Sequence, residues 1–135
     1  EPFHFQHFSW DSLLLQVSQA EQFHIGGISL IVTGLGGQYL AEDLLDALRD
    51  VERLAPNLKD EPDHRAIACA SWIMNLGKGN FASSTMLKRI REGKWEAAAK
   101  EMKRWDKVTV GGKKKPFRRL TEAHLFLTGE VKTFL

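Results

Sequence analysis

The chain is poor in cysteine, in proline and in long apolar runs, and each shortage excludes a class of protein. Its single cysteine, Cys69, cannot form an internal disulfide, and its small and apolar neighbours are typical of a buried, inert thiol. No apolar run approaches the ~20 residues of a membrane-spanning helix, since residues 28–35 form a short run interrupted by Gly34. The first residues lack the basic segment and apolar core of a signal peptide. We therefore expect no stable membrane insertion.

The chain also lacks a strong excess of either charge. Its 19 basic and 17 acidic residues give a net charge of +2, which is too balanced to indicate a nucleic-acid partner. With 43% hydrophobic and 27% charged residues, the composition is that of a soluble globular protein. A length of 135 residues allows one domain, or two small lobes that share a helix.

Helical periodicity is clear from about residue 39 onward. Apolar residues recur at helical spacing through residues 39–56, namely Leu40, Leu44, Leu48, Val51 and Leu54. Pro56 is expected to end this helix. Start signals around Pro62 predict a second helix that ends near Gly77. Because this second helix is apolar on most sides, we expect it at the centre of the core.

Three further helices are predicted in the remainder of the chain. Ser83 or Ser84 is expected to cap a short helix that stops at Gly93. The next helix follows Trp95, and the last runs from about Phe117 to Gly129. Residues 1–38 are harder to interpret. Their glycine turns favour short strands, and a first helix near residues 11–19 would have Asp11 or Ser12 as its N-cap.

Four motifs follow one another in the C-terminal two thirds. Residues 75–81 read NLGKGNF, a glycine-rich segment expected to form a turn, and are followed by SSTMLKRIREGKW at residues 83–95. Then come the Gly111-Gly112 pair and the Arg118-Arg119-x-x-Glu122 motif. In this order and with these gaps, residues 39–129 closely resemble the C-terminal lobe of the phage-type lysozyme and endolysin family, glycoside hydrolase family 24. Residues 39–54 resemble the long helix that joins the two lobes in that family.

The resemblance implies a fold and an activity. The fold would be α+β and mostly helical, a two-lobed lysozyme-like domain. Residues 1–38 would form a small β-containing N-terminal lobe, residues 39–56 the linking helix, and residues 57–135 the C-terminal helical lobe. The activity would be hydrolysis of the β-1,4 bond between N-acetylmuramic acid and N-acetylglucosamine in peptidoglycan. No cofactor would be needed, and the protein would be a monomer that stays in the host cytoplasm until its release to the periplasm, or is associated with the virion.

The resemblance also implies which C-terminal residues contact substrate. Met74 and Asn75 fall where the family lines the floor of the saccharide cleft. Arg118 falls where a family arginine approaches the catalytic carboxylate and tunes its pKa. From the residues alone, Asn75 reads equally well as the cap of a helix end, and Arg118 as a solvated cation.

The catalytic set of the family is not found at its expected spacing. The family places a Glu, an Asp and a Thr before a glycine turn, and the best alignment puts Ser9, Ser18 and His24 at these positions. Three interpretations remain open. The domain binds glycan without cleaving it; or Asp11 or Glu21 serves as the acid with His24 on the water-activating side; or the N-terminal third comes from a different reading frame.

Two other candidate sites have weaker support. His4, His7 and His24 would supply three zinc ligands, but no cysteine or acidic residue stands at a fixed spacing, so we expect no metal site. Basic residues cluster at 113–119, and such a run is usually a solvated loop. Its functional interpretations are attraction to anionic envelope phosphates or, as a third class of function, a basic adaptor for protein or nucleic acid.

Overall fold

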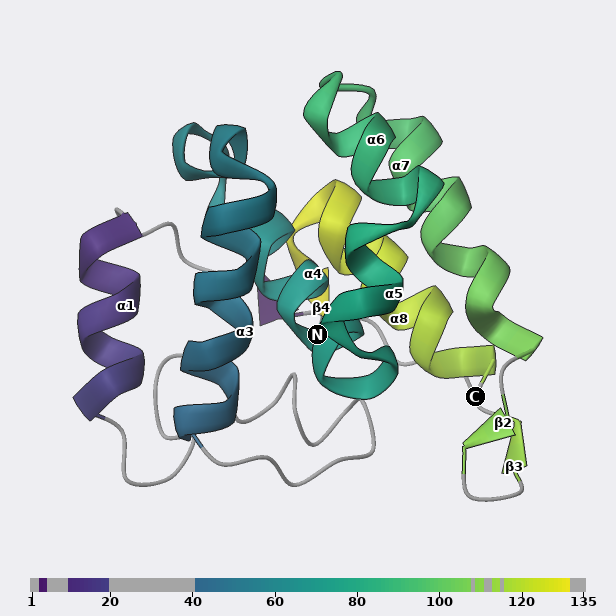
Figure 1. The fold of residues 1–135 in the computed structure, drawn as a ribbon, viewed down its shortest axis with the longest axis horizontal. Coiled ribbons are helices and arrows are strands. Elements are labelled where there is room, and N and C mark those ends of the chain that lie inside the picture. Colours follow the sequence, from purple (N-terminus) through teal and green to yellow (C-terminus); the bar gives the residue numbers. More distant parts are fainter. Residues whose placement is uncertain are drawn as a thin grey trace.

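A computed structural model describes residues 3–4, 10–19, 41–107, 109–110, 113–114 and 116–131. Its α-helices are α1 Trp10–Gln19, α3 Ala41–Leu54, α4 Asp63–Leu76, α5 Lys78–Ala82, α6 Thr85–Arg91, α7 Trp95–Lys103 and α8 Pro116–Thr128 (Figure 1). Two 3-10 turns, η1 Pro56–Asp60 and η2 Arg104–Lys107, follow α3 and α7. The strands are two residues each and form two antiparallel pairs: β1 Phe3–His4 with β4 Glu130–Val131, and β2 Thr109–Val110 with β3 Lys113–Lys114.

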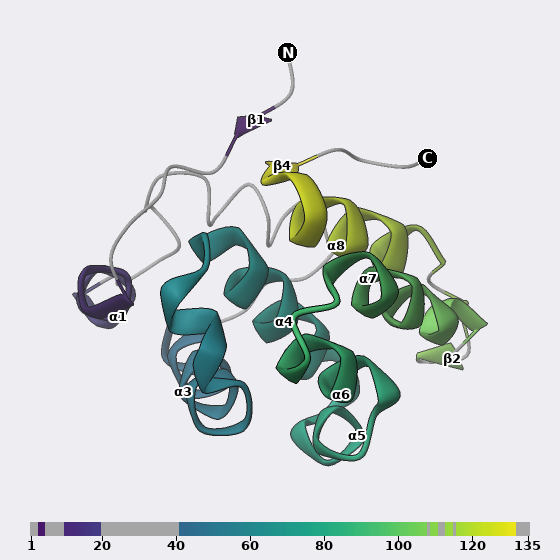
Figure 2. The same ribbon diagram turned by 90° about the horizontal axis from the view of Figure 1, so that it is seen from above.

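Helix α4 lies at the centre of the molecule. It packs against α3 on one side and α8 on the other, while α7 covers α8 and α6 packs on α7 (Figures 1 and 2). Every residue from Ala66 to Ile73 is buried, so α4 needs partners on all of its faces. The prediction of a central, mostly apolar helix is confirmed. Trp72 anchors this core, with its ring against those of Phe81 and Trp105.

The helix boundaries agree with the start and stop signals in the sequence. Ser84 is the N-cap of α6, and its hydroxyl accepts a hydrogen bond from the Leu87 backbone N–H at 3.0 Å. Gly93 and Gly129 follow α6 and α8 with φ of 73° and 78°, the left-handed conformation in which glycine commonly ends helices.

Two local predictions were wrong. Helix α1 begins at Trp10, so Asp11 and Ser12 lie inside its first turn and neither is the N-cap. Trp10 belongs to the helix because it anchors α1 on α3: its ring is buried, and its indole Nε1 donates to Glu52 Oε2 at 2.6 Å. The second error concerns the NLGKGNF segment, expected to be a turn, in which residues 78–82 form the short helix α5.

Within residues 1–38, the structure describes only 3–4 and 10–19. Strand β1 pairs with β4 at the opposite end of the chain. The mostly helical architecture is confirmed, whereas a β-containing lobe over residues 1–38 and the lobe boundaries at 38 and 56 stay predictions. No helix in the described part of the chain is long and apolar enough to cross a membrane.

Candidate functional site

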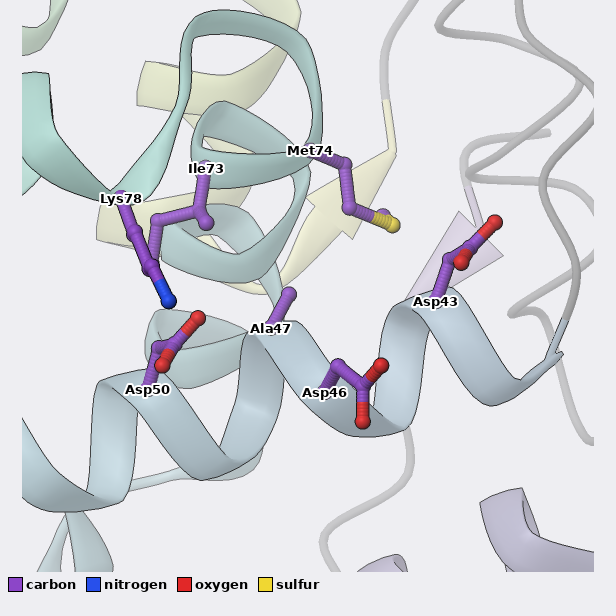
Figure 3. A pocket seen from close by; sticks show the side chains of 7 residues that line it. All are labelled: Asp43, Asp46, Ala47, Asp50, Ile73, Met74 and Lys78. Atoms are coloured by element: carbon purple, nitrogen blue, oxygen red, sulfur yellow. The ribbon is translucent and has the colours of Figure 1, made fainter.

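A groove of about 360 Å³ lies between α3, α4 and the start of α5. Its lining residues are Asp43, Asp46, Ala47, Asp50, Ile73, Met74 and Lys78, and together they define what we call the acidic groove (Figure 3). The three aspartates are spaced by three and four residues along α3, which places them on one face of that helix. Figure 3 shows them along one wall, with Met74 and Ile73 on α4 and Lys78 reaching across from α5.

The two walls of the acidic groove differ in chemistry. Carboxylates on α3 accept hydrogen bonds from hydroxyl or amide groups, while Met74 and Ile73 offer an apolar surface. Such a combination suits an uncharged, hydroxyl-rich ligand with apolar faces, such as a saccharide. Within the described residues, no group of three His, Cys, Asp or Glu side chains is arranged to hold a metal ion.

A buried polar network joins α4 to α8. The Ser71 hydroxyl donates to Glu122 Oε2 at 2.5 Å, and Arg119 Nε lies 3.0 Å from Glu122 Oε1. Arg119 Nη2 then donates to Asn75 Oδ1 at 2.5 Å. The Arg119 and Glu122 side chains are 1% and 0% exposed, so the pair is shielded from water.

The network fixes the orientation of the Asn75 amide. Because Arg119 has donors only, the group that faces it must be the amide oxygen of Asn75. The Asn75 NH₂ group is therefore turned away from the Arg119 guanidinium. Asn75 is half-buried at the end of α4, next in sequence to Met74, which lines the acidic groove.

Of the residues expected from the sequence to contact substrate, Met74 lines the acidic groove, while the Asn75 amide oxygen accepts from Arg119 on α8. Their contact with substrate stays a prediction. The third, Arg118, lies on α8, but its side chain is outside the described part of the chain. The arginine that the structure places beside Asn75 is its neighbour Arg119. The contact of Arg119 with Asn75 was not predicted from the sequence. The three-residue spacing of Arg119 and Glu122 was nevertheless a signal for an ion pair on one helix face.

Of the expected catalytic residues, the structure describes only Asp11, and this residue does not line the acidic groove. Asp11 is exposed on α1, which lies on the side of α3 away from α4 (Figures 1 and 2), so Asp11 and Met74 are separated by α3. Glu21 and His24 lie outside the described residues. Asp43, Asp46 and Asp50 have the spacing of a polar helix face, and their place in a groove was not predicted from the sequence.

Comparison with known proteins gives a family match. The family model described as phage lysozyme matches residues 19–122. An endolysin of Acyrthosiphon pisum secondary endosymbiont phage 1 is 32% identical over 95 residues, which cover 65% of this chain and 62% of that protein. A SAR-endolysin of Bacteriophage PS119 is 35% identical over 75 residues, 55% of this chain and 42% of that protein. The chain thus spans less than two thirds of the length of these curated relatives.

A solved structure supports the fold. The muramidase domain of SpmX from Asticaccaulis excentricus aligns with a TM-score of 0.53 and 30% identity, over 69% of this chain and 71% of that one. The fold is therefore lysozyme-like. The family match starts at residue 19, so it takes in Glu21 and His24 and leaves out Asp11, Ser9 and Ser18. It extends the resemblance, which had begun at residue 39, into the N-terminal segment.

Proposed function

Because this chain belongs to the phage lysozyme family, we propose that it acts on bacterial peptidoglycan as a lysozyme. The bond cleaved is the β-1,4 link between N-acetylmuramic acid and N-acetylglucosamine. The family match over residues 19–122 carries this proposal, and the acidic groove, which Met74 lines, supplies a site for a saccharide. The relatives named endolysin and muramidase support the same substrate class.

The mechanism is general acid/base catalysis, without a cofactor. An acid protonates the leaving oxygen while a base activates water on the other face of the sugar, and the two groups stand ~6.5–9.5 Å apart in inverting enzymes. Glu21 is the acid and His24 activates the water, since both fall inside the family match. Asp11 is the less favoured acid because it lies outside that match and across α3 from Met74.

The glycan-binding roles fall to residues at the end of α4. Met74 contacts a sugar face in the acidic groove, and Asn75 donates its amide NH₂ to a sugar oxygen. Arg119 is a positioning residue, because it orients the Asn75 amide from behind. Arg118 keeps its proposed place near the catalytic acid. The protein works as a monomer that remains in the host cytoplasm until it is released to the periplasm.

A turbidity-clearing assay on permeabilised Gram-negative cells tests the hydrolytic function. Glu21→Gln removes the acid and is expected to lower the clearing rate by roughly 10²–10⁴-fold. The matched control is Glu42→Gln, the same substitution at an exposed position of α3 that does not line the acidic groove. Clearing by Glu21→Gln at the rate of the Glu42→Gln control would contradict the assignment of Glu21.

A second candidate function is glycan binding without cleavage. It is favoured by Ser9 and Ser18, which stand where the alignment places the family's two carboxylates, since a serine cannot deliver a proton at neutral pH as a glutamic acid can. Co-sedimentation with purified peptidoglycan sacculi distinguishes the two. Binding that is weakened by Met74→Lys, with no release of soluble fragments by the unsubstituted protein, would select this second function.

A further inference from the structure

A second groove, of about 350 Å³, lies between the end of α5 and α6. Its lining residues are Ala82, Ser83, Ser84, Leu87, Lys88, Arg91 and Glu92, and together they define the basic groove. None of them lines the acidic groove, which lies at the other end of α5. The function proposed above makes no use of this surface.

The single carboxylate of the basic groove is already paired. Glu92 forms an ion pair with Arg89, and its Oε2 lies 3.9 Å from Lys94 Nζ. The hydrogen bond from Arg89 lowers the pKa of Glu92, with smaller contributions from nearby cations, so its carboxylate stays ionised at neutral pH. The charge of Lys88 also lowers this pKa, so Glu92 offsets part of the positive charge of the groove, and an excess of cations remains around it.

Neither of the two cations that line the basic groove forms a close ion pair with a carboxylate of the described residues, although the charge of Lys88 acts on Glu92. Arg91 Nε donates to the Leu54 backbone oxygen at 2.8 Å, which holds the guanidinium in place and leaves its two Nη groups as donors. Lys88 makes no ion pair within the described part of the chain. Lys88 and Arg91 are three residues apart on α6 and so lie on the same helix face.

The lining of the groove is partly apolar. Ala82 is exposed, whereas Leu87 is only 1% exposed and adds little surface that a ligand can reach. The two cations therefore carry most of the recognition of an anion. A held guanidinium with free donors beside a flexible ammonium group is the combination that recognises phosphate, through a fork of hydrogen bonds and a point charge.

We infer that the basic groove, through Lys88 and Arg91, binds a phosphate group. A phosphate carries between one and two negative charges and three or more acceptor oxygens, which matches the excess of positive charge around the basic groove better than a singly charged carboxylate does. The phosphate comes either from an anionic phospholipid headgroup or from a soluble phosphate, and both present the same chemistry. This inference is independent of glycan hydrolysis, because no residue proposed for hydrolysis lines the basic groove.

Titration of the full chain with inorganic phosphate, followed by amide chemical shifts, tests the inference. Saturable shifts are expected for residues 82–92, and the Lys88→Gln/Arg91→Gln pair should raise the dissociation constant at least about tenfold. The matched control is Lys100→Gln/Lys103→Gln, which removes the same charge from exposed positions of α7 outside the groove. This control should change the constant less than about twofold. Lys88→Gln alone, at an exposed position, guards against misfolding of the pair.

A vesicle arm identifies the source of the phosphate. Sedimentation with phosphatidylglycerol vesicles, compared with phosphatidylcholine vesicles, reports headgroup binding. Vesicle binding that the Lys88→Gln/Arg91→Gln pair loses and the control pair keeps would assign a lipid headgroup. Saturable phosphate binding without vesicle binding would assign a soluble phosphate, and both results support the groove. The assignment of a phosphate site to the basic groove would be overturned if phosphate binding were not saturable. It would also be overturned if Lys88→Gln/Arg91→Gln and the control pair weakened phosphate binding equally.

Discussion

Arg119 Nε and Glu122 Oε1 lie 3.0 Å apart within one turn of α8, and both side chains are almost completely buried. A buried ion pair adds to stability only when the remaining polar atoms also find partners, because both charges lose their hydration. Ser71 and Asn75 on α4 supply such partners for Glu122 Oε2 and Arg119 Nη2. The contact between α4 and α8 is therefore polar as well as apolar, and Asn75 is held by it.

Glu122→Gln should strongly destabilise the fold. The substitution keeps the shape of the side chain but leaves Arg119 as a buried charge without its counter-ion. Breaking a buried pair in this way typically costs ~3–5 kcal/mol of unfolding free energy. Urea unfolding followed by circular dichroism measures the change.

The control for Glu122→Gln is the double variant Arg119→Met/Glu122→Leu. It removes both charges and fills similar volume, so it should recover much of the lost stability. A double variant that is less stable than Glu122→Gln would show that the hydrogen bonds of the network, rather than the unpaired charge, set the cost.

The helices of the C-terminal region could be predicted because their signals are local. Apolar spacing, Ser84 as a cap and Gly129 as a stop each depend on residues within a turn or two. Which arginine of the 118–119 pair faces the core could not be predicted in this way. One buried stripe on α8 is formed by Arg119, Glu122, Ala123 and Phe126. A buried helix face is predicted from the spacing of apolar residues, and the two charged residues of this stripe are not among them.

The acidic groove could not be predicted either, for a different reason. Asp43, Asp46 and Asp50 have the spacing of a polar helix face, and Asp43 and Asp46 are indeed exposed. They become the wall of a groove only because α4 and Lys78 of α5 stand opposite. That arrangement is tertiary, and no property of residues 41–54 alone distinguishes a groove wall from a solvated face.

Gly129→Ala should destabilise the C-terminal end of α8. Gly129 has φ of 78°, and a Cβ atom added there would meet His64 Cδ2 at 2.9 Å. The left-handed conformation alone costs an alanine roughly 1–2 kcal/mol, and displacement of the His64 ring adds to this. Thermal unfolding should therefore show a lower Tm.

Gly79→Ala provides the opposite case for the same substitution. Gly79 lies inside α5 without a positive φ, and a Cβ there meets nothing within 4 Å. Alanine is favoured over glycine in helices by about 0.5–1 kcal/mol, so the Tm should rise or stay unchanged. A fall in Tm as large as that of Gly129→Ala would contradict the role given to the backbone conformation.

Ser84→Ala should lower stability by about 1 kcal/mol, the usual effect of removing an N-cap. The Ser84 hydroxyl satisfies the Leu87 N–H at the start of α6, and alanine leaves that donor without its partner. Ser83→Ala is the adjacent control, because the Ser83 hydroxyl is exposed and only donates to carbonyls of its own turn. Equal losses for the two variants in urea unfolding would refute the capping role.

The Cys69 thiol should be unreactive in the folded protein, and its burial should make the free energy of unfolding fall at alkaline pH. Burial, and after it the charge of Glu122, raises the pKa of the Cys69 thiol far above its ordinary value. Ellman's reagent should therefore react at pH 8 only after urea unfolding.

Because the unfolded thiol ionises near pH 8.5 and the folded one does not, the folded state retains a proton that the unfolded state releases. The contribution of the buried Cys69 thiol to the free energy of unfolding is complete below pH 8.5. Above that pH the contribution declines, by up to about 1.4 kcal/mol per pH unit. Cys69→Ala should lose that part of the alkaline slope, and a variant with the same slope as the unsubstituted protein would assign the decline to other groups.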